Sequence, residues 1–185
     1  MEFRNRVGGA YALTVFTAIL PGHKEQLEQL IESMPKKEQS PLARLSRLHL
    51  SRIHIFDELV YQGPKQKADR LNQPYLVFTS TADGHDLDDY LDEICEKIPA
   101  EADSWWSHCV GYPGTRDRAA FKRYIRHNKV DTALLGCAHP SATVQEIHRA
   151  LALREKLIDF AVTSQGLDAA ELHARFVREF SGAAA

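Results

Sequence analysis

The sequence contains few cysteines, no long apolar run and no recognisable export signal. Its three cysteines, Cys95, Cys109 and Cys137, are odd in number and show no CxxC spacing, which argues against a disulfide framework and a zinc site. The first apolar run spans only about ten residues and no cleavage site follows it. A bilayer requires roughly 20 apolar residues, so we expect no membrane insertion, reduced thiols and a cytoplasmic location.

The chain also lacks an excess of charge of one sign. It has 23 Lys and Arg residues against 25 Asp and Glu residues, for a net charge of -2, and the cations are spread among the acids. Because nucleic-acid binding depends on clustered cations, we expect no nucleic-acid partner. A phosphate-binding glycine-rich loop, an HExxH motif and a nucleophile elbow are absent too. These absences exclude several common enzyme classes and predict no metal site.

The 185 residues are 44% hydrophobic and 26% charged, which is typical of one globular domain. A pattern of apolar strand, Pro or Gly turn and amphipathic helix occurs three times. One further strand has no helix after it, and residues 57–74 are expected to form a long exposed connection. The strands are predicted at Ala12–Leu20, Leu48–Phe56, Tyr75–Thr81 and Thr132–Ala138, with apolar helix stripes over Leu27–Met34, Leu87–Ile98 and Val144–Ile158.

This order predicts an α+β fold, a ferredoxin-like β-α-β-β-α-β sandwich with extra helices. We expect a single domain over residues 1–185, with its core at 12–160, an insertion at 102–128 and a C-terminal helix at 167–180. Helices on one side of a four-stranded sheet leave its other face bare, and an exposed apolar face is unfavourable in water. We therefore expect a homodimer that covers this face and a ligand cavity between the layers.

Three segments resemble a bacterial protein family. They are Leu48-His49-Leu50-Ser51-Arg52, the strand from Val77 to Asp83-Gly84, and the stretch from Trp106 to Pro113. The similarity extends from about residue 13 to residue 160, although Leu50 and Ser51 replace the aromatic residue and alanine that are more frequent in the family. This family is similar to the dimeric α+β barrel superfamily of antibiotic-biosynthesis monooxygenases, haem-degrading enzymes, chlorite-dismutase-like proteins and dye-decolourising peroxidases.

The resemblance implies a ferredoxin-like unit, dimerisation through the sheet and a cavity for a small-molecule ligand. It implies no particular reaction, since one scaffold carries many functions. Haem is the cofactor that it suggests, and because haem ligands in such relatives tend to come from a helix, it favours His148 over His108 and His139. The remaining candidates for cofactor contacts are Trp106, Tyr112, Asp83 and Arg126.

The strand Leu48–Phe56 carries the first candidate site residues. Alternation places His49 on the opposite face from Arg52 and His54. A guanidinium in an apolar strand needs a carboxylate, a backbone acceptor or an anionic ligand, so Arg52 forms either an internal salt bridge or part of a ligand site. His49 is either a hydrogen-bonded structural residue or a haem ligand or proton shuttle.

The stretch Trp105–Pro113 is dense in aromatic and titratable groups, which is typical of a cavity wall or a tightly packed corner. His108 is a catalytic candidate there, but adjacent residues point apart and nothing orients a Cys109–His108 pair as a nucleophile. Asp83-Gly84 has the composition of a turn that enters a helix. Arg126 belongs to a short basic face that either is solvated or meets the carboxylates of a small acid or of haem.

Three functional hypotheses follow. The first is a small-molecule oxidoreductase or monooxygenase-like enzyme, dependent on haem or O2, with His49, Arg52 and His108 as its catalytic candidates. The second is a non-catalytic dimeric module that binds a ligand or accompanies a redox enzyme. A third hypothesis is an interaction protein that docks through its C-terminal helix.

Overall fold

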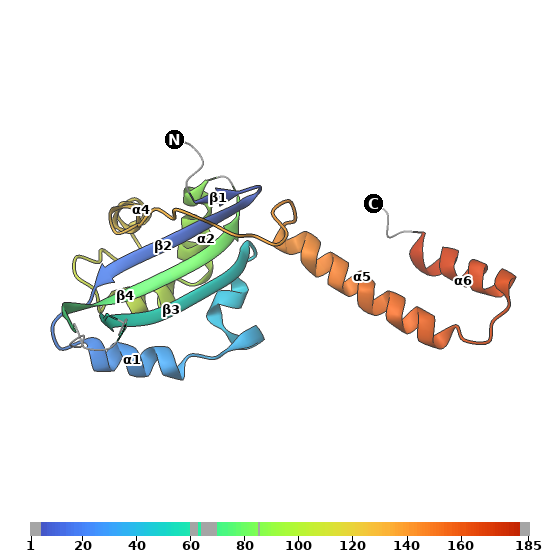
Figure 1. The fold of residues 1–185 in the computed structure, drawn as a ribbon, viewed down its shortest axis with the longest axis horizontal. Coiled ribbons are helices and arrows are strands. Elements are labelled where there is room, and N and C mark those ends of the chain that lie inside the picture. Colours follow the sequence, from blue (N-terminus) through green and yellow to red (C-terminus); the bar gives the residue numbers. More distant parts are fainter. Residues whose placement is uncertain (1–4, 60–62, 64–69, 85, 182–185) are drawn as a thin grey trace. The chain divides into compact units, whose positions relative to one another are not determined.

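Four antiparallel strands form a sheet in the first part of the chain (Figure 1). We describe a computed structural model over residues 5–59, 63, 70–84 and 86–181. The sheet order is β1-β2-β4-β3, and the α+β class expected from the sequence is confirmed. The strands span β1 Arg6–Val7, β2 Ala10–Ala18, β3 Leu48–Glu58 and β4 Arg70–Asp83, so three of the four predicted strands are present.

The inner face of the sheet forms the hydrophobic core. Val15 on β2 and Ile53 on β3 both lie opposite Phe78 on β4. Helices α1 (Lys24–Ser33) and α2 (Leu87–Lys97) contribute Leu27 and Leu91 to the same buried cluster. The alternation of apolar residues along each strand accounts for this face, because successive side chains of a strand point to opposite sides.

Short helical segments complete this part of the chain. Two 3-10 turns, Lys37–Gln39 and Pro41–Arg44, lead from α1 to β3. Helices α3 (Pro99–Trp106) and α4 (Arg118–His127) occupy the range expected to be an insertion, and they add three large buried rings to the core. These rings are Trp105, Trp106 and Phe121.

The strand predicted at Thr132–Ala138 is wrong, since this segment is an irregular loop. Its upstream neighbours do pair with β2, because the Phe16 N–H donates to the Asn128 carbonyl at 3.0 Å and the Val130 N–H donates to the Thr14 carbonyl at 2.9 Å. Beyond Thr14 the edge is occupied: the Ala12 N–H donates to the Asn5 carbonyl at 2.8 Å, and β1 pairs with Tyr11 and Ala10. The outer edge of β2 has a single set of backbone N–H and C=O groups available for pairing. Because the N-terminal hairpin uses these groups, the predicted strand cannot form there.

The loop is nevertheless fixed to this hairpin. The Gly9 N–H donates to the Pro140 carbonyl at 2.7 Å. Gly8 has a φ of +58°, and a Cβ at this position would lie 2.1 Å from the Pro140 oxygen. Only glycine therefore allows the two backbones to come so close.

The expected connection at residues 57–74 lies partly outside the described residues. Glu58 pairs with Arg70, so β3 extends past Phe56 and β4 begins at Arg70. Residues 70–74 are therefore strand and not connection.

The chain divides into two compact units, Met1–Val144 and Gln145–Ala185. The division falls inside the range 12–160 that was expected to form one core. Helix α5 (Val144–Thr163) begins at this boundary and is followed by α6 (Ala169–Phe180), which confirms the two helices predicted here. The rings of Phe160, Phe176 and Phe180 pack together with centroid distances of 5.0–5.7 Å. Within the described part of the chain, no helix is both long and apolar enough to cross a membrane.

Candidate functional site

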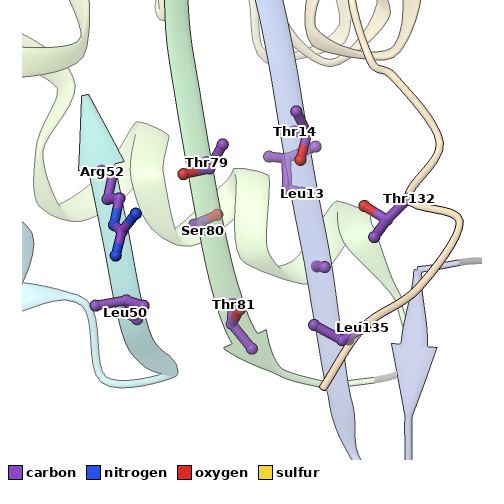
Figure 2. A pocket seen from close by; sticks show the side chains of 10 residues that line it. Leu13, Thr14, Leu50, Arg52, Thr79, Ser80, Thr81, Thr132 and Leu135 are labelled. Atoms are coloured by element: carbon purple, nitrogen blue, oxygen red, sulfur yellow. The ribbon is translucent and has the colours of Figure 1, made fainter. Parts of the chain in front are cut away.

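The outer face of the sheet carries a pocket of about 250 Å³ (Figure 2). Arg52 on β3 lies opposite Thr79 on β4, and Thr79 lies opposite Thr14 on β2. Side chains opposite each other on one sheet face are roughly 5 Å apart at Cβ. The Arg52 guanidinium and the hydroxyls of Thr79 and Thr14 therefore lie in one row across the sheet. The next row is Leu50, Thr81 and Ala12, which places an apolar group on each side of a third hydroxyl.

Arg52 makes no ion pair or hydrogen bond with any described residue, and its side chain is exposed. The sequence predicts either an internal salt bridge or a ligand site for Arg52. No described carboxylate forms that salt bridge. No acidic residue is among the described residues that line the pocket. Figure 2 shows the guanidinium on the face shared with Thr79 and Leu50. The pocket is therefore electropositive and rich in hydroxyl groups.

Thr132 and Leu135 come from the loop beside β2 and line the pocket next to that strand (Figure 2). The position of Thr132 is set by Asn5, which is buried. The Asn5 side-chain oxygen accepts the Thr132 N–H, while its amide nitrogen donates to an Asp131 carboxylate oxygen at 3.0 Å. The loop is thus held against β2 without forming a strand.

His54 lies on the same outer face as Arg52, one row further along, opposite Val77. Its side chain is exposed. Phe16 belongs to this row, since it also lies opposite Val77, and its ring approaches that of Phe56 edge to face at 6.5 Å. The outer face is therefore apolar at one end and cationic in the middle.

His49 lies at an irregularity of the β3–β4 pairing, between Leu48 and Leu50. Its Nε2 is 2.6 Å from Oδ1 of Asp83, and Oδ2 of Asp83 accepts the Val144 N–H at 2.7 Å. The Asp83 carboxylate thus links β3 to the residue that begins α5. These contacts match the structural role that was one alternative for His49.

His108 contacts another histidine and not the neighbouring cysteine. The Nδ1 atoms of His108 and His23 are 3.1 Å apart. Burial, with a further contribution from His23, lowers the pKa of His108. The Cys109 thiol is buried next to the Thr17 hydroxyl, 3.3 Å away, and burial raises its pKa to about 11. A protonated thiol is the opposite of what a nucleophile requires.

The stretch Trp105–Pro113 is a tightly packed corner. Trp106 is 1% exposed and packs against Phe78, Tyr112 and Phe121. The Tyr112 hydroxyl donates to Oδ1 of Asp103 at 2.7 Å. Of the two alternatives for this stretch, packing accounts for both aromatic residues proposed as cofactor contacts.

Two further cofactor candidates, Arg126 and His148, have other surroundings. Arg126 on α4 forms an ion pair with Asp88, and His148 lies exposed on α5, in the second unit. Among the described residues there is no cluster of three or more His, Cys, Asp or Glu side chains that could hold a metal.

Sequence reasoning identified Arg52 but missed the hydroxyls around it. Thr14, Thr79 and Thr81 belong to strands that were predicted, and alternation would have placed Thr79 and Thr81 on one face. The register between strands was not predictable, and neither was the loop that brings Thr132 to them. Threonine is also common in strands for packing reasons, so its presence alone carries no signal.

Comparison of the chain with protein-family models, with curated proteins and with solved structures found no match. The resemblance to the dimeric α+β barrel superfamily thus stays a prediction.

Proposed function

We propose that this chain is a non-catalytic module that binds a small organic anion on the outer face of its sheet. The observation that carries the proposal is Arg52, a cation without a partner among the described residues, in line with the hydroxyls of Thr79 and Thr14. A guanidinium presents a fork of donors that matches a carboxylate. Threonine hydroxyls supply further donors to the same oxygens.

The shape of the pocket supports a small ligand with a short apolar body. About 250 Å³ is below the usual range for drug-sized ligands. Leu50, Ala12 and Leu135 line the pocket beside the hydroxyls, so a carboxylate bound at Arg52 would have its carbon chain against them. Small carboxylic acids are therefore the ligand class that we infer, and phosphate is the competing anion.

The binding function is favoured over an oxidoreductase because of the groups that line the pocket. Hydroxyls, a guanidinium and aliphatic side chains bind and orient an anion. None of these side chains is a carboxylate, an imidazole or a thiol, the usual general bases of enzymes. His54 lies one row away on the same face.

A ferredoxin-like relationship belongs to the same proposal. The order β2-β4-β3, with α1 after β2 and α2 after β4, supports it.

The test is a titration of the purified chain with acetate, butyrate, benzoate and inorganic phosphate, followed by calorimetry and by amide NMR shifts. We expect a carboxylate to bind and to move the amide signals of Thr14, Thr79 and Thr81. A hydrogen bond to a charged group contributes about 1.5–3 kcal/mol, so Arg52→Gln should weaken binding at least about tenfold. Arg52→Lys keeps the charge but loses the fork, and it should have an intermediate effect.

The matched control is Arg123→Gln, since Arg123 is an exposed arginine on α4 and also has no partner among the described residues. It should bind like the unmodified chain. Equal affinities for the Arg52→Gln and Arg123→Gln variants, or no binding of any of these anions at millimolar concentration, would refute the proposal. Stronger binding of phosphate than of every carboxylate would refute the assigned ligand class.

A further inference from the structure

The unit formed by α5 and α6 buries very little of its own surface. It has about 40 residues, a length at which a domain usually needs a disulfide, a metal or a partner to fold. Among its described residues only Phe160, Ser164 and Phe180 are buried. Two buried rings are a small core, so this unit needs a further surface to cover it.

One flank of α5 is already used by α6. The Phe160 ring lies 5.7 Å from the ring of Phe176 and 5.4 Å from that of Phe180. The Arg175 guanidinium lies 5.4 Å from the centroid of the Phe160 ring, and the Lys156 ammonium lies 4.8 Å from that of Phe180. These contacts close the pair of helices on the side of Phe160.

Another flank of α5 carries an apolar stripe that α6 leaves open. The α5 seam, as we define it, consists of Ile147, Leu151, Arg154, Ile158 and Ala161. The intervals of four, three, four and three residues are those of a heptad repeat, which pairs helices along a shared seam. Leu151 is 52% exposed and Ile158 is 45% exposed. α6 therefore leaves these seam positions uncovered, and an uncovered apolar stripe is a candidate surface for a partner helix.

The one charged residue of the seam determines the direction in which two seams can pair. Arg154 forms an ion pair with Glu155, with Nη1 and Oε1 2.8 Å apart. Parallel pairing would place the two Arg154 side chains next to each other. Antiparallel pairing centred between Leu151 and Arg154 places Arg154 of one copy opposite Leu151 of the other, and Ile147 opposite Ile158. This arrangement separates the like charges and keeps the aliphatic side chains in contact.

We propose that the α5 seam binds the α5 seam of a second copy of this chain in antiparallel orientation, so that two α5–α6 pairs form a four-helix bundle. The alternative occupant, the outer face of the sheet, carries the unpaired Arg52. An apolar seam laid over a guanidinium would bury a charge without a carboxylate. In a second seam each arginine keeps Glu155 as its partner, so no charge is buried without a carboxylate.

The test is the mass of the full chain in solution, measured by light scattering after size-exclusion chromatography. We expect a dimer that becomes a monomer in the double variant Leu151→Lys, Ile158→Lys. The matched control is Ala152→Lys, which adds a charge to an exposed position of α5 outside the seam and should stay a dimer. Far-UV circular dichroism reports whether the double variant keeps its helices.

Cross-linking tests the register and does not depend on the folding of that variant. In a Cys137→Ser background, chains with Leu151→Cys are mixed with chains with Arg154→Cys and oxidised. Antiparallel pairing predicts disulfides between the two kinds of chain, because only those cysteines face each other. A monomeric wild-type chain, a dimer that survives the double variant, or a dimer lost only with Phe16→Lys on the sheet would overturn the proposal. Predominant cross-links between two Leu151→Cys chains would overturn it as well.

Discussion

The Asp103 carboxylate fixes the turn that follows α3, and its removal is the most direct test of the packed corner. Its Oδ1 accepts the Tyr112 hydroxyl at 2.7 Å and the Thr115 N–H at 2.9 Å, and its Oδ2 accepts the Thr115 hydroxyl at 3.0 Å. Thr115 is 5% exposed. In the Asp103→Ala variant the donors of both residues would therefore lack an acceptor, with little access to water.

The expected magnitude follows from these three hydrogen bonds. A buried group that loses its partner destabilises a protein by about 1–3 kcal/mol. Because Tyr112 is only partly buried, we expect Asp103→Ala to lower the free energy of unfolding by about 3 kcal/mol, which corresponds to a decrease in Tm of roughly 6–12 °C at this chain length. Tyr112→Phe removes one hydroxyl and should cost about 1 kcal/mol. Asp103→Asn keeps an acceptor and should cost less than Asp103→Ala.

The assay is urea unfolding followed by tryptophan fluorescence, since Trp105 and Trp106 lie in this corner. The control is Glu96→Ala, because Glu96 is exposed and, within the described part of the chain, forms an ion pair only with its neighbour Lys97. Such surface changes stay within about 0.5 kcal/mol. A loss below about 1 kcal/mol for Asp103→Ala, with an unchanged dependence on urea, would show that this network does not hold the turn.

Two further outcomes are expected. Burial lowers the pKa of His108 in the folded chain, so stability is full above the unfolded histidine pKa of about 6.5 and is lost as the pH falls through the folded value, with a slope of at most about 1.4 kcal/mol per pH unit. Urea unfolding between pH 7.5 and 5 should show this decrease, and a His108→Gln variant with the same decrease would contradict it. The haem hypothesis predicts that added haem gives the chain a Soret band, and that the His148→Ala variant lacks this band. A spectrum identical to that of free haem would contradict the hypothesis.

The three long strands and the amphipathic helices were predictable because each has a local signal. Val15 lies in an apolar run, Ile53 lies between the polar residues Arg52 and His54, and Leu27 and Leu91 lie on helix stripes. The strand at Thr132–Ala138 has the same kind of signal and yet is a loop. The reason is competition for an edge: Asn5 and β1 take the hydrogen bonds that this strand would have needed.

The site shows the same contrast. Arg52 stood out in the sequence as a cation within an apolar strand, and alternation placed it on the same face as His54, as the pairing with β4 confirms. The sequence left open whether a carboxylate would neutralise it. Only the fold shows that no described carboxylate pairs with Arg52. It also shows that Thr79 and Thr14 lie in the same row as Arg52.

The sequence by itself determined the three long strands and the amphipathic helices of this protein, because hydrophobic periodicity and turn residues act over a few neighbouring positions. Tertiary structure alone decided which edge of the sheet was free, which cation stayed unpaired among the described residues, and which flank of α5 is not covered by α6. These outcomes depend on competition between segments far apart in the chain for the same hydrogen bonds and the same apolar surface, and no local pattern records which segment succeeds.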